Sequence, residues 1–375
     1  MFVSKTRLDY QLGLFITSKQ FVQLIRLIII TTLFSFHSSV HANINISIDD
    51  SFPSKVIALF EAETVTEKAL DEIAATEGAK ALINKVTQYT EESNEELLKH
   101  ALKRAAKGET WEKDPYYFWY TKKHNKELSK LIDSISSAES ANKNVVERLS
   151  SYLPENFKLS TKVILVVGGS SSGWTNNSGN FQLGLDHHIN DPIEVIENTM
   201  AHEVFHVAQE QLMPDSQGDS AVSADRVDAL LAALMMEGTA SLFDDFTGIQ
   251  QEGELLKSTV AKQVKNRERI QSAFLLFETL IFRTAHDADA DLGQLYQIGF
   301  MSQWDNFAYE VGKVMSEAII KYDGKQAIGK LLQKGPRHFV GRYLELCEKD
   351  PQLTQFTSVF QTLVSTEGGS IREAE

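Results

Sequence analysis

The sequence predicts a mostly helical α+β protein, on three observations along its 375 residues. Residues 55–155 repeat apolar positions at three- and four-residue spacing, which is typical of amphipathic helices. The period then changes, because KVILVVGG at 162–169 is a β-branched run typical of a buried strand, and FQLGLDHHI at 181–189 alternates like a second strand. From residue 191 onward the spacing is again mainly helical, with breaks near 287–291, at YDGK and at KGPRH.

These changes of pattern divide the chain into four predicted parts. The first, 1–42, is typical of a signal peptide. A helical N-terminal region at 43–155 precedes a core at 156–250, which contains the small β-sheet and two long helices. A helical C-terminal lobe spans 251–375.

An export signal is predicted from the pattern near residue 30. Arg26 precedes the apolar run at 27–36, and Val40-His41-Ala42 supplies small residues at the usual cleavage spacing. The run is shorter than the roughly 20 residues that a membrane-spanning helix needs. We therefore expect a periplasmic or secreted bacterial protein with no stable membrane span after cleavage of the signal.

Composition and charge narrow the class of protein. The chain is 42% hydrophobic and 23% charged, as globular proteins are, and its formal net charge is −14. No cluster of Lys and Arg with interleaved aromatics stands out, so nucleic acid is not an expected partner. Cys347 is the only cysteine, so no intramolecular disulfide can form.

The stretch AHEVFHVAQE at 201–210 carries the clearest chemical signal. His202 and His206 are four residues apart, so on a helix they share one face and can bind one metal ion. Glu203 points to the side, where it can reach a water on that metal without being a ligand. The pattern HExxH needs a helix, and we predict one over 192–212.

The start of this helix is predicted from residues outside the histidine pattern. Asp191 is a suitable N-cap, Pro192 fits the first helical position, and Glu194 completes a capping box. A second helix is predicted over 224–246, with an apolar stripe that includes Leu234 and Gly238.

A hydrolytic zinc site needs a third protein ligand and one open position. The metzincin pattern would require histidine at 212 and glycine at 209, but these positions are Leu212 and Gln209. Glu237 lies on the apolar stripe of the second helix, where a buried carboxylate needs a cation or proton partner. Asp225 is the competing candidate, about 120° around the helix from Glu237, and the two are not expected to bind the same ion.

Several other residues of this region are candidates for supporting roles. Gly238 would allow the two metal-bearing helices to approach closely around an ion, since glycine inside a helix otherwise costs about 1 kcal/mol relative to alanine. Asp244 and Asp245 could orient the ligands. His187 and His188 are predicted to end the second strand and to point to opposite faces, so that one of them could contact a substrate.

The motifs resemble those of the gluzincin zinc peptidases, most closely the aminopeptidase-like branch. HEVFH followed by EGTA is similar to their ligand helices, and YEVGKVMSEAIIKYDGKQAIGKLL at 309–332 is similar to their Tyr-Glu-x-Gly helix. The resemblance covers roughly 160–345 and implies one zinc ion held by His202, His206 and Glu237. It also implies that Tyr309 donates a hydrogen bond to the oxyanion, with Tyr296 in YQIGF as the alternative.

The sequence also departs from that family. No Gly-x-Met-Glu-Asn element, which grips the free amine of an aminopeptidase substrate, is present, and Ser241 stands where thermolysin-like enzymes have aspartate. Endopeptidase and exopeptidase specificity therefore stay open. We expect an exported zinc metallopeptidase of zincin-like fold that hydrolyses peptide bonds with Glu203 as general base. The alternatives are a non-catalytic binding or scaffold protein with a structural zinc, and a metal-free helical interaction protein.

Overall fold

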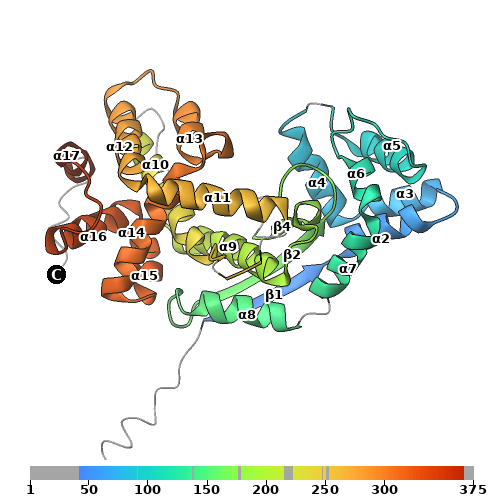
Figure 1. The fold of residues 1–375 in the computed structure, drawn as a ribbon, viewed down its shortest axis with the longest axis horizontal. Helices are drawn as coiled ribbons and strands as arrows, with labels where there is room; N and C mark the ends of the chain where they lie inside the picture. The colour runs from blue at the N-terminus through green and yellow to red at the C-terminus, as the bar shows by residue number, and fades with distance from the viewer. Residues whose placement is uncertain are drawn as a thin grey trace, which may run out of the picture. The chain divides into compact units, whose positions relative to one another are not determined.

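In the part of the chain that the computed structural model describes, one four-stranded sheet is accompanied by a large set of helices, as the α+β prediction requires (Figure 1). The structure describes residues 42–90, 92–136, 139–175, 179–214, 223–246, 248–250 and 253–366. The predicted export signal lies outside these residues except for Ala42. None of the helices in these ranges is long and apolar enough to cross a membrane.

The helices fall into a group before the second strand and a group after the fourth. The first group is α2 (Ser51–Glu61), α3 (Glu67–Ala74), α4 (Glu77–Thr87), α5 (Glu95–Ala106), α6 (Phe118–Lys123), α7 (Asn125–Ser136) and α8 (Glu139–Ser150). The second group is α9 (Ile193–Leu212), α10 (Ser223–Ala240), α11 (Glu254–Glu268), α12 (Ile270–His286), α13 (Leu292–Phe300), α14 (Phe307–Asp323), α15 (Gln326–Lys334), α16 (Pro336–Lys349) and α17 (Ser358–Thr366).

The sheet has the strand order β1-β2-β4-β3. β1 (Asn43–Asp49) and β4 (Phe181–Gly184) both pair parallel to β2 (Lys158–Val166). β3 (Gly173–Thr175) pairs antiparallel to β4 and is the edge strand on that side. The sequence patterns predicted neither β1 nor β3: NINISID alternates polar and apolar residues as a half-buried strand does and was overlooked, whereas the three residues GWT are too short to show a period.

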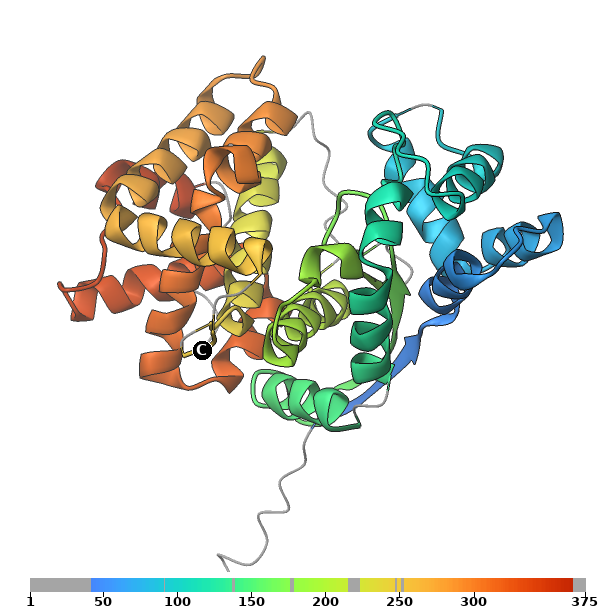
Figure 2. The same ribbon diagram turned by 45° about the vertical axis from the view of Figure 1, so that its right-hand side comes forward.

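Helices cover both faces of this sheet. Trp174 faces α4, where Lys85 lies 5.9 Å from the centre of the indole ring, while its neighbour Thr175 donates a hydrogen bond to Glu210 of α9. Since successive residues of a strand point to opposite faces, α4 and α9 lie on opposite sides of β3. α8 packs against both α9 and β1, as Figure 2 shows.

The segment between β4 and α9 differs from its prediction. The second strand ends at Gly184, and Leu185–His188 form a short 3-10 helix, η1, so His187 and His188 do not alternate across a strand. Asp191 does not cap α9 either. Pro192 takes the N-cap position without a side-chain cap, and the Asp191 carboxylate turns back to His188, so no capping box forms.

The second ligand helix is shorter than predicted and packs differently. α10 ends at Ala240, and a 3-10 turn, η2 (Ser241–Phe243), follows it. The close approach at Gly238 is made to α14 rather than to α9, because a Cβ atom built on Gly238 would lie 2.3 Å from the Cα of Gly312. The two glycines therefore form a helix crossing that no larger residue fits.

The C-terminal breaks agree with the sequence patterns. α12 and α13 are separated at residues 287–291, and α14 ends at Gly324. α15 ends at Gly335, whose φ of 92° is accessible mainly to glycine, and Pro336 opens α16.

Candidate metal centre

Three predicted ligands meet between α9 and α10. The ligand atoms of His202, His206 and Glu237 all lie within 4.8 Å of one another. The two Nε2 atoms are 3.1 Å apart, and Glu237 Oε2 lies 3.4 Å from His206 Nε2 and 3.9 Å from His202 Nε2. All three side chains are largely buried, with 11–17% of each exposed.

These distances fit a tetrahedral zinc ion. Two ligand atoms that each lie 2.0–2.1 Å from zinc at a tetrahedral angle are about 3.3 Å apart. The three observed separations bracket that value. In addition, Glu237 Oε2 is buried without a hydrogen-bond partner among the described residues, which is costly for a carboxylate oxygen unless a cation binds it.

In each histidine, the hydrogen bond made by Nδ1 leaves Nε2 free to act as a metal ligand. His202 Nδ1 lies 3.0 Å from Asp244 Oδ2, and His206 Nδ1 lies 2.6 Å from Gln209 Oε1. Because both acceptors are oxygen atoms, each Nδ1 carries the proton and each Nε2 presents a lone pair to the centre. Two such lone pairs facing each other at 3.1 Å would repel, so either a proton or a metal ion must lie between them.

Gln209 is fixed by α10. Its Nε2 donates to the carbonyl of Met236 at 2.8 Å and to the Thr239 hydroxyl at 2.7 Å, so its oxygen must face His206. This orienting role of Gln209 was not predicted from the sequence, where the residue only excluded the metzincin pattern. The signal that could have found it is its spacing, three residues after His206 on the same helix face.

Asp225, the competing ligand, is not part of the cluster. Among the described residues, the group of donors that could hold one ion consists of His202, His206 and Glu237 and does not include Asp225. Asp225 lies in the first turn of α10, far along the helix from Glu237, where a carboxylate stabilises the helix dipole.

Glu203 lies beside the three ligands. Burial raises the pKa of Glu203, and the charges of His202 and His206 oppose that shift. The edge strand comes close to it, because a Cβ atom built on Gly173 would lie 3.0 Å from Glu203 Oε1. Any side chain at position 173 would therefore press on the Glu203 carboxylate.

The two tyrosine candidates also lie near the cluster. Burial and then the negative charge of Glu237 raise the pKa of Tyr309 well above its usual value, so the hydroxyl keeps its proton and can donate it in a hydrogen bond. Tyr296 has its pKa raised by burial and then by the same carboxylate, but 39% of it is exposed. Tyr309 lies three residues before Gly312, so the glycine crossing brings it toward Glu237.

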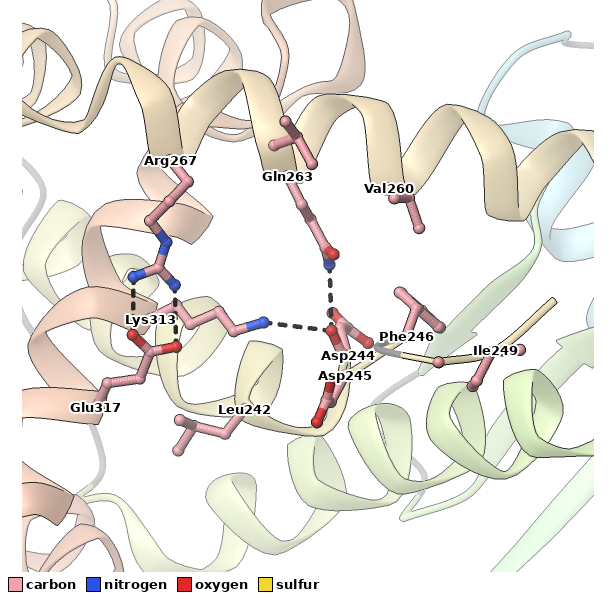
Figure 3. Close-up of a pocket in the computed structure, with 12 residues that line it drawn as sticks. Leu242, Asp244, Asp245, Phe246, Ile249, Val260, Gln263, Arg267, Lys313 and Glu317 are labelled. Carbon is pink, nitrogen blue, oxygen red and sulfur yellow. Dashed lines mark hydrogen bonds and ion pairs between the residues drawn. The ribbon is translucent and has the colours of Figure 1, made fainter. Parts of the chain in front are cut away.

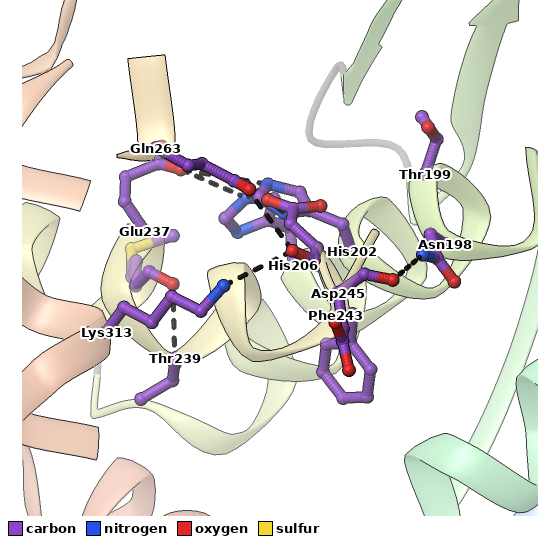
Figure 4. A network of polar contacts seen from close by, with 12 residues as sticks. Asn198, Thr199, His202, His206, Glu237, Thr239, Phe243, Asp245, Gln263 and Lys313 are labelled. Carbon is purple, nitrogen blue, oxygen red and sulfur yellow. Dashed lines mark hydrogen bonds and ion pairs between the residues drawn. The ribbon is translucent and has the colours of Figure 1, made fainter. Parts of the chain in front are cut away.

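Asp244, which orients His202, lies after η2 in a segment that hydrogen bonds hold in place, and Figure 4 shows the bond from Asn198 to the neighbouring Asp245. Asn198 donates to the carbonyl of Asp245 at 2.7 Å, and Arg148 donates to the carbonyl of Phe243 at 2.9 Å. Lys313 donates to the carbonyl of Asp244 itself at 3.2 Å. Because α10 ends at Ala240, this segment can turn back toward α9, where Asp244 reaches His202.

Three recesses surround the centre, and Asp244 lines all of them. One of about 140 Å³ contains His202 and Glu203, and another of about 140 Å³ contains Tyr309. The third, of about 490 Å³, opens between α11, α14 and the segment after η2 (Figure 3). Residues of α11 line each recess, so this helix borders the whole site.

A buried His-His-Glu set with a neighbouring glutamate is the arrangement of a zinc-dependent peptidase. Comparison with known families agrees, since residues 70–352 match the family described as "Putative zinc dependent peptidase (DUF5700)". The match covers about three quarters of the chain, and the protein belongs to this family. No curated protein and no solved structure matches the chain.

Proposed function

We propose that this protein is a single-zinc metallopeptidase in which His202, His206 and Glu237 are the metal ligands. The observation that carries the proposal is the convergence of three donor atoms within 4.8 Å, with both histidine Nε2 atoms presenting lone pairs to the same point. When bound, zinc would lower the pKa of a coordinated water and polarise the scissile carbonyl.

The remaining steps belong to side chains. Glu203 takes a proton from the attacking water and later delivers it to the leaving amine. A raised pKa suits this role, because a carboxylate that is too acidic is a weak base. Tyr309 donates its hydroxyl proton in a hydrogen bond to the oxygen that gains negative charge.

We assign the site to the gluzincin type. The support is that the two motifs of the resemblance, EGTA on α10 and YEVG on α14, meet at the crossing of Gly238 and Gly312. Through that crossing, α10 with Glu237 and α14 with Tyr309 pack directly against each other. Tyr309 is preferred to Tyr296 because it is the more buried of the two hydroxyl donors.

An extended peptide is the substrate that this geometry favours. β3 is an edge strand of the described sheet, and Gly173 on it lies against Glu203. An edge strand offers unpaired backbone groups to which an extended chain can add. A peptide bound in this way would pass beside the general base.

We also propose export of the protein. β1 begins at Asn43, the residue that follows the predicted cleavage point after Ala42. Mass spectrometry of the protein recovered from its native host should find Asn43 as the first residue. A mature protein that retains residues 1–42 would contradict the export signal.

A two-step experiment tests the metallopeptidase. Purified protein should contain about one zinc per chain, and incubation with a mixed peptide library should give cleavage that a chelator abolishes. Glu203→Gln should retain zinc and lose activity by about 10²-fold or more. Glu210→Gln, an exposed glutamate on the same helix, is the matched control and should keep activity.

Each alternative gives a different result. Bound zinc without cleavage of any library peptide would support a non-catalytic zinc protein. Absence of zinc after purification and after zinc addition would leave the metal-free interaction protein. Either outcome would overturn the proposed function.

A further inference from the structure

A tight turn before α9 brings His188 and Asp191 together. Ile189 has φ −60° and ψ 124°, Asn190 has φ 70°, and the Asp191 amide donates to the His188 carbonyl at 3.0 Å. These are the angles of a type II turn, whose third residue is favourable for asparagine. The turn sets His188 Nδ1 3.2 Å from Asp191 Oδ2.

The pair is buried but incompletely bonded. The side chains of His188 and Asp191 are 1% and 0% exposed. His188 Nε2 and Asp191 Oδ1 have no hydrogen-bond partner among the described residues. A carboxylate oxygen accepts, so Nδ1 carries the proton and Nε2 is left as an acceptor. Buried polar atoms normally have a hydrogen-bond partner, so an unpaired ring nitrogen next to the candidate metal centre indicates that a bound ligand supplies the donor.

The position of His188 indicates what that ligand is. His188 lines the same recess as His202 and Glu203, together with Ser172, which directly precedes β3. His188 is not one of the clustered metal donors. Its neighbour His187 does not line that recess, although it also has an unpaired Nε2. Of the two histidines, His188 is therefore the one that borders the space beside the proposed general base.

We propose that His188, oriented by Asp191, is a substrate-binding residue that accepts a hydrogen bond from a backbone N–H of the bound peptide. The proposal rests on the proposed peptidase function. Every peptide residue except proline offers such a donor, so this contact would secure the peptide backbone without selecting a side chain. Asp191 would act as a positioning residue, since it fixes the ring and the nitrogen that carries the proton.

The first test separates binding from chemistry. A reporter peptide is chosen from those that the wild-type protein cleaves in the mixed library, and KM and kcat are measured for three variants. His188→Leu should raise KM about tenfold and leave kcat and zinc content unchanged, because one uniform hydrogen bond is lost. His188→Gln places an amide oxygen near the position of Nε2 and should recover most of the loss. His187→Leu is the matched control and should resemble the wild type.

The second test identifies the atom that is recognised. The reporter is N-methylated at one backbone position at a time, which removes one N–H from the peptide. One position should raise KM about tenfold for the wild type and His188→Gln, and have little effect for His188→Leu. The proposal would be overturned if all variants were equally sensitive to methylation at every position. If His188→Leu fails to fold, only the wild type and His188→Gln are compared, and a wild type without any sensitive position would overturn the proposal.

The outcomes also separate this inference from the function on which it rests. A zinc-loaded wild type that cleaves no library peptide overturns the peptidase function and the His188 contact with it. A wild type that cleaves normally, with unchanged KM in His188→Leu, overturns only the contact. A melting temperature that falls in His188→Leu without a change in KM would assign the pair to folding alone.

Discussion

Replacing Gly312 by alanine tests whether the helix crossing positions Tyr309, the proposed donor to the oxyanion. A Cβ atom at position 312 would lie 2.4 Å from the carbonyl oxygen of Leu234 and 2.7 Å from the Cα of Gly238, against 3.4 Å or more in ordinary contacts. Both obstacles are backbone atoms, which cannot rotate away. α14 must therefore move from α10 by about 1 Å.

The energetic cost follows from this displacement. Overpacking of a core costs typically 1–3 kcal/mol, and a collision with backbone belongs near the upper end. Alanine regains about 1 kcal/mol through its higher helix propensity. We therefore expect Gly312→Ala to lower the free energy of unfolding by about 2 kcal/mol.

The effect on catalysis should be larger. Tyr309 lies one turn before Gly312 and moves with α14, while Glu237 stays on α10. A misplacement of about 1 Å in a catalytic group can reduce the rate about 10²-fold. Urea denaturation gives the stability, and kcat on a library-derived reporter gives the rate. Gly293→Ala, an exposed helical glycine with only a side-chain oxygen nearby, is the matched control and should leave kcat unchanged without lowering the stability.

Two results would refute this reasoning. Wild-type stability in Gly312→Ala would mean that the crossing is looser than the described distances. A loss of stability with unchanged kcat would mean that Tyr309 does not act at the reaction centre. In that case Tyr296→Phe should be the variant that loses activity.

Three further predictions concern the ligands and their surroundings. Gln209→Leu removes the acceptor of His206 Nδ1 and should weaken zinc binding about 10–100-fold, measured by competition with a chromophoric chelator; equal affinity would contradict the orienting role. Gly173→Val should reduce kcat more than zinc content, since its side chain would meet Glu203. Without metal, burial lowers the pKa of His202, but Asp244 outweighs it and raises the pKa to about 10. Zinc must displace that proton, so its affinity should rise at least roughly tenfold per pH unit from pH 6.5 to 8.5. For the same reason the stabilising contribution of protonated His202 in the zinc-free protein should be complete below pH 6.5 and should be lost as the pH rises toward 10, which thermal unfolding in chelator checks.

The sequence predicted the local parts of this site and missed the parts that depend on distant packing. His202, Glu203 and His206 share one helix, so their relation follows from helical geometry alone. Glu237 was found because a carboxylate on an apolar stripe needs a partner. Its preference over Asp225 agrees with the cluster that forms. Endopeptidase or exopeptidase specificity, in contrast, depends on how the peptide leaves the recesses, which no local pattern encodes.

The errors have a common physical cause, which is that a residue can contact any of several neighbouring elements and the sequence pattern does not say which. Asp191 was predicted to cap the helix that follows it, but the type II turn places its carboxylate within hydrogen-bond distance of His188 instead. Gly238 was predicted to admit α9, but it admits α14. Both residues are small or polar at positions where such residues usually serve their own helix. Only the tertiary fold decides that they serve another element.

The glycines near the candidate metal centre position residues that are not metal ligands, which the pattern of the three ligands alone does not predict. Gly173 leaves room for the Glu203 carboxylate on one side, and the crossing of Gly238 and Gly312 brings Tyr309 toward Glu237 on the other. Neither approach touches a metal ligand directly through a side chain. If the proposed function holds, a variant of these glycines should keep the three proposed ligands and bound zinc while losing activity. That separation distinguishes a catalytic centre from a structural zinc site, because in a structural site the geometry beyond the ligands would affect only stability.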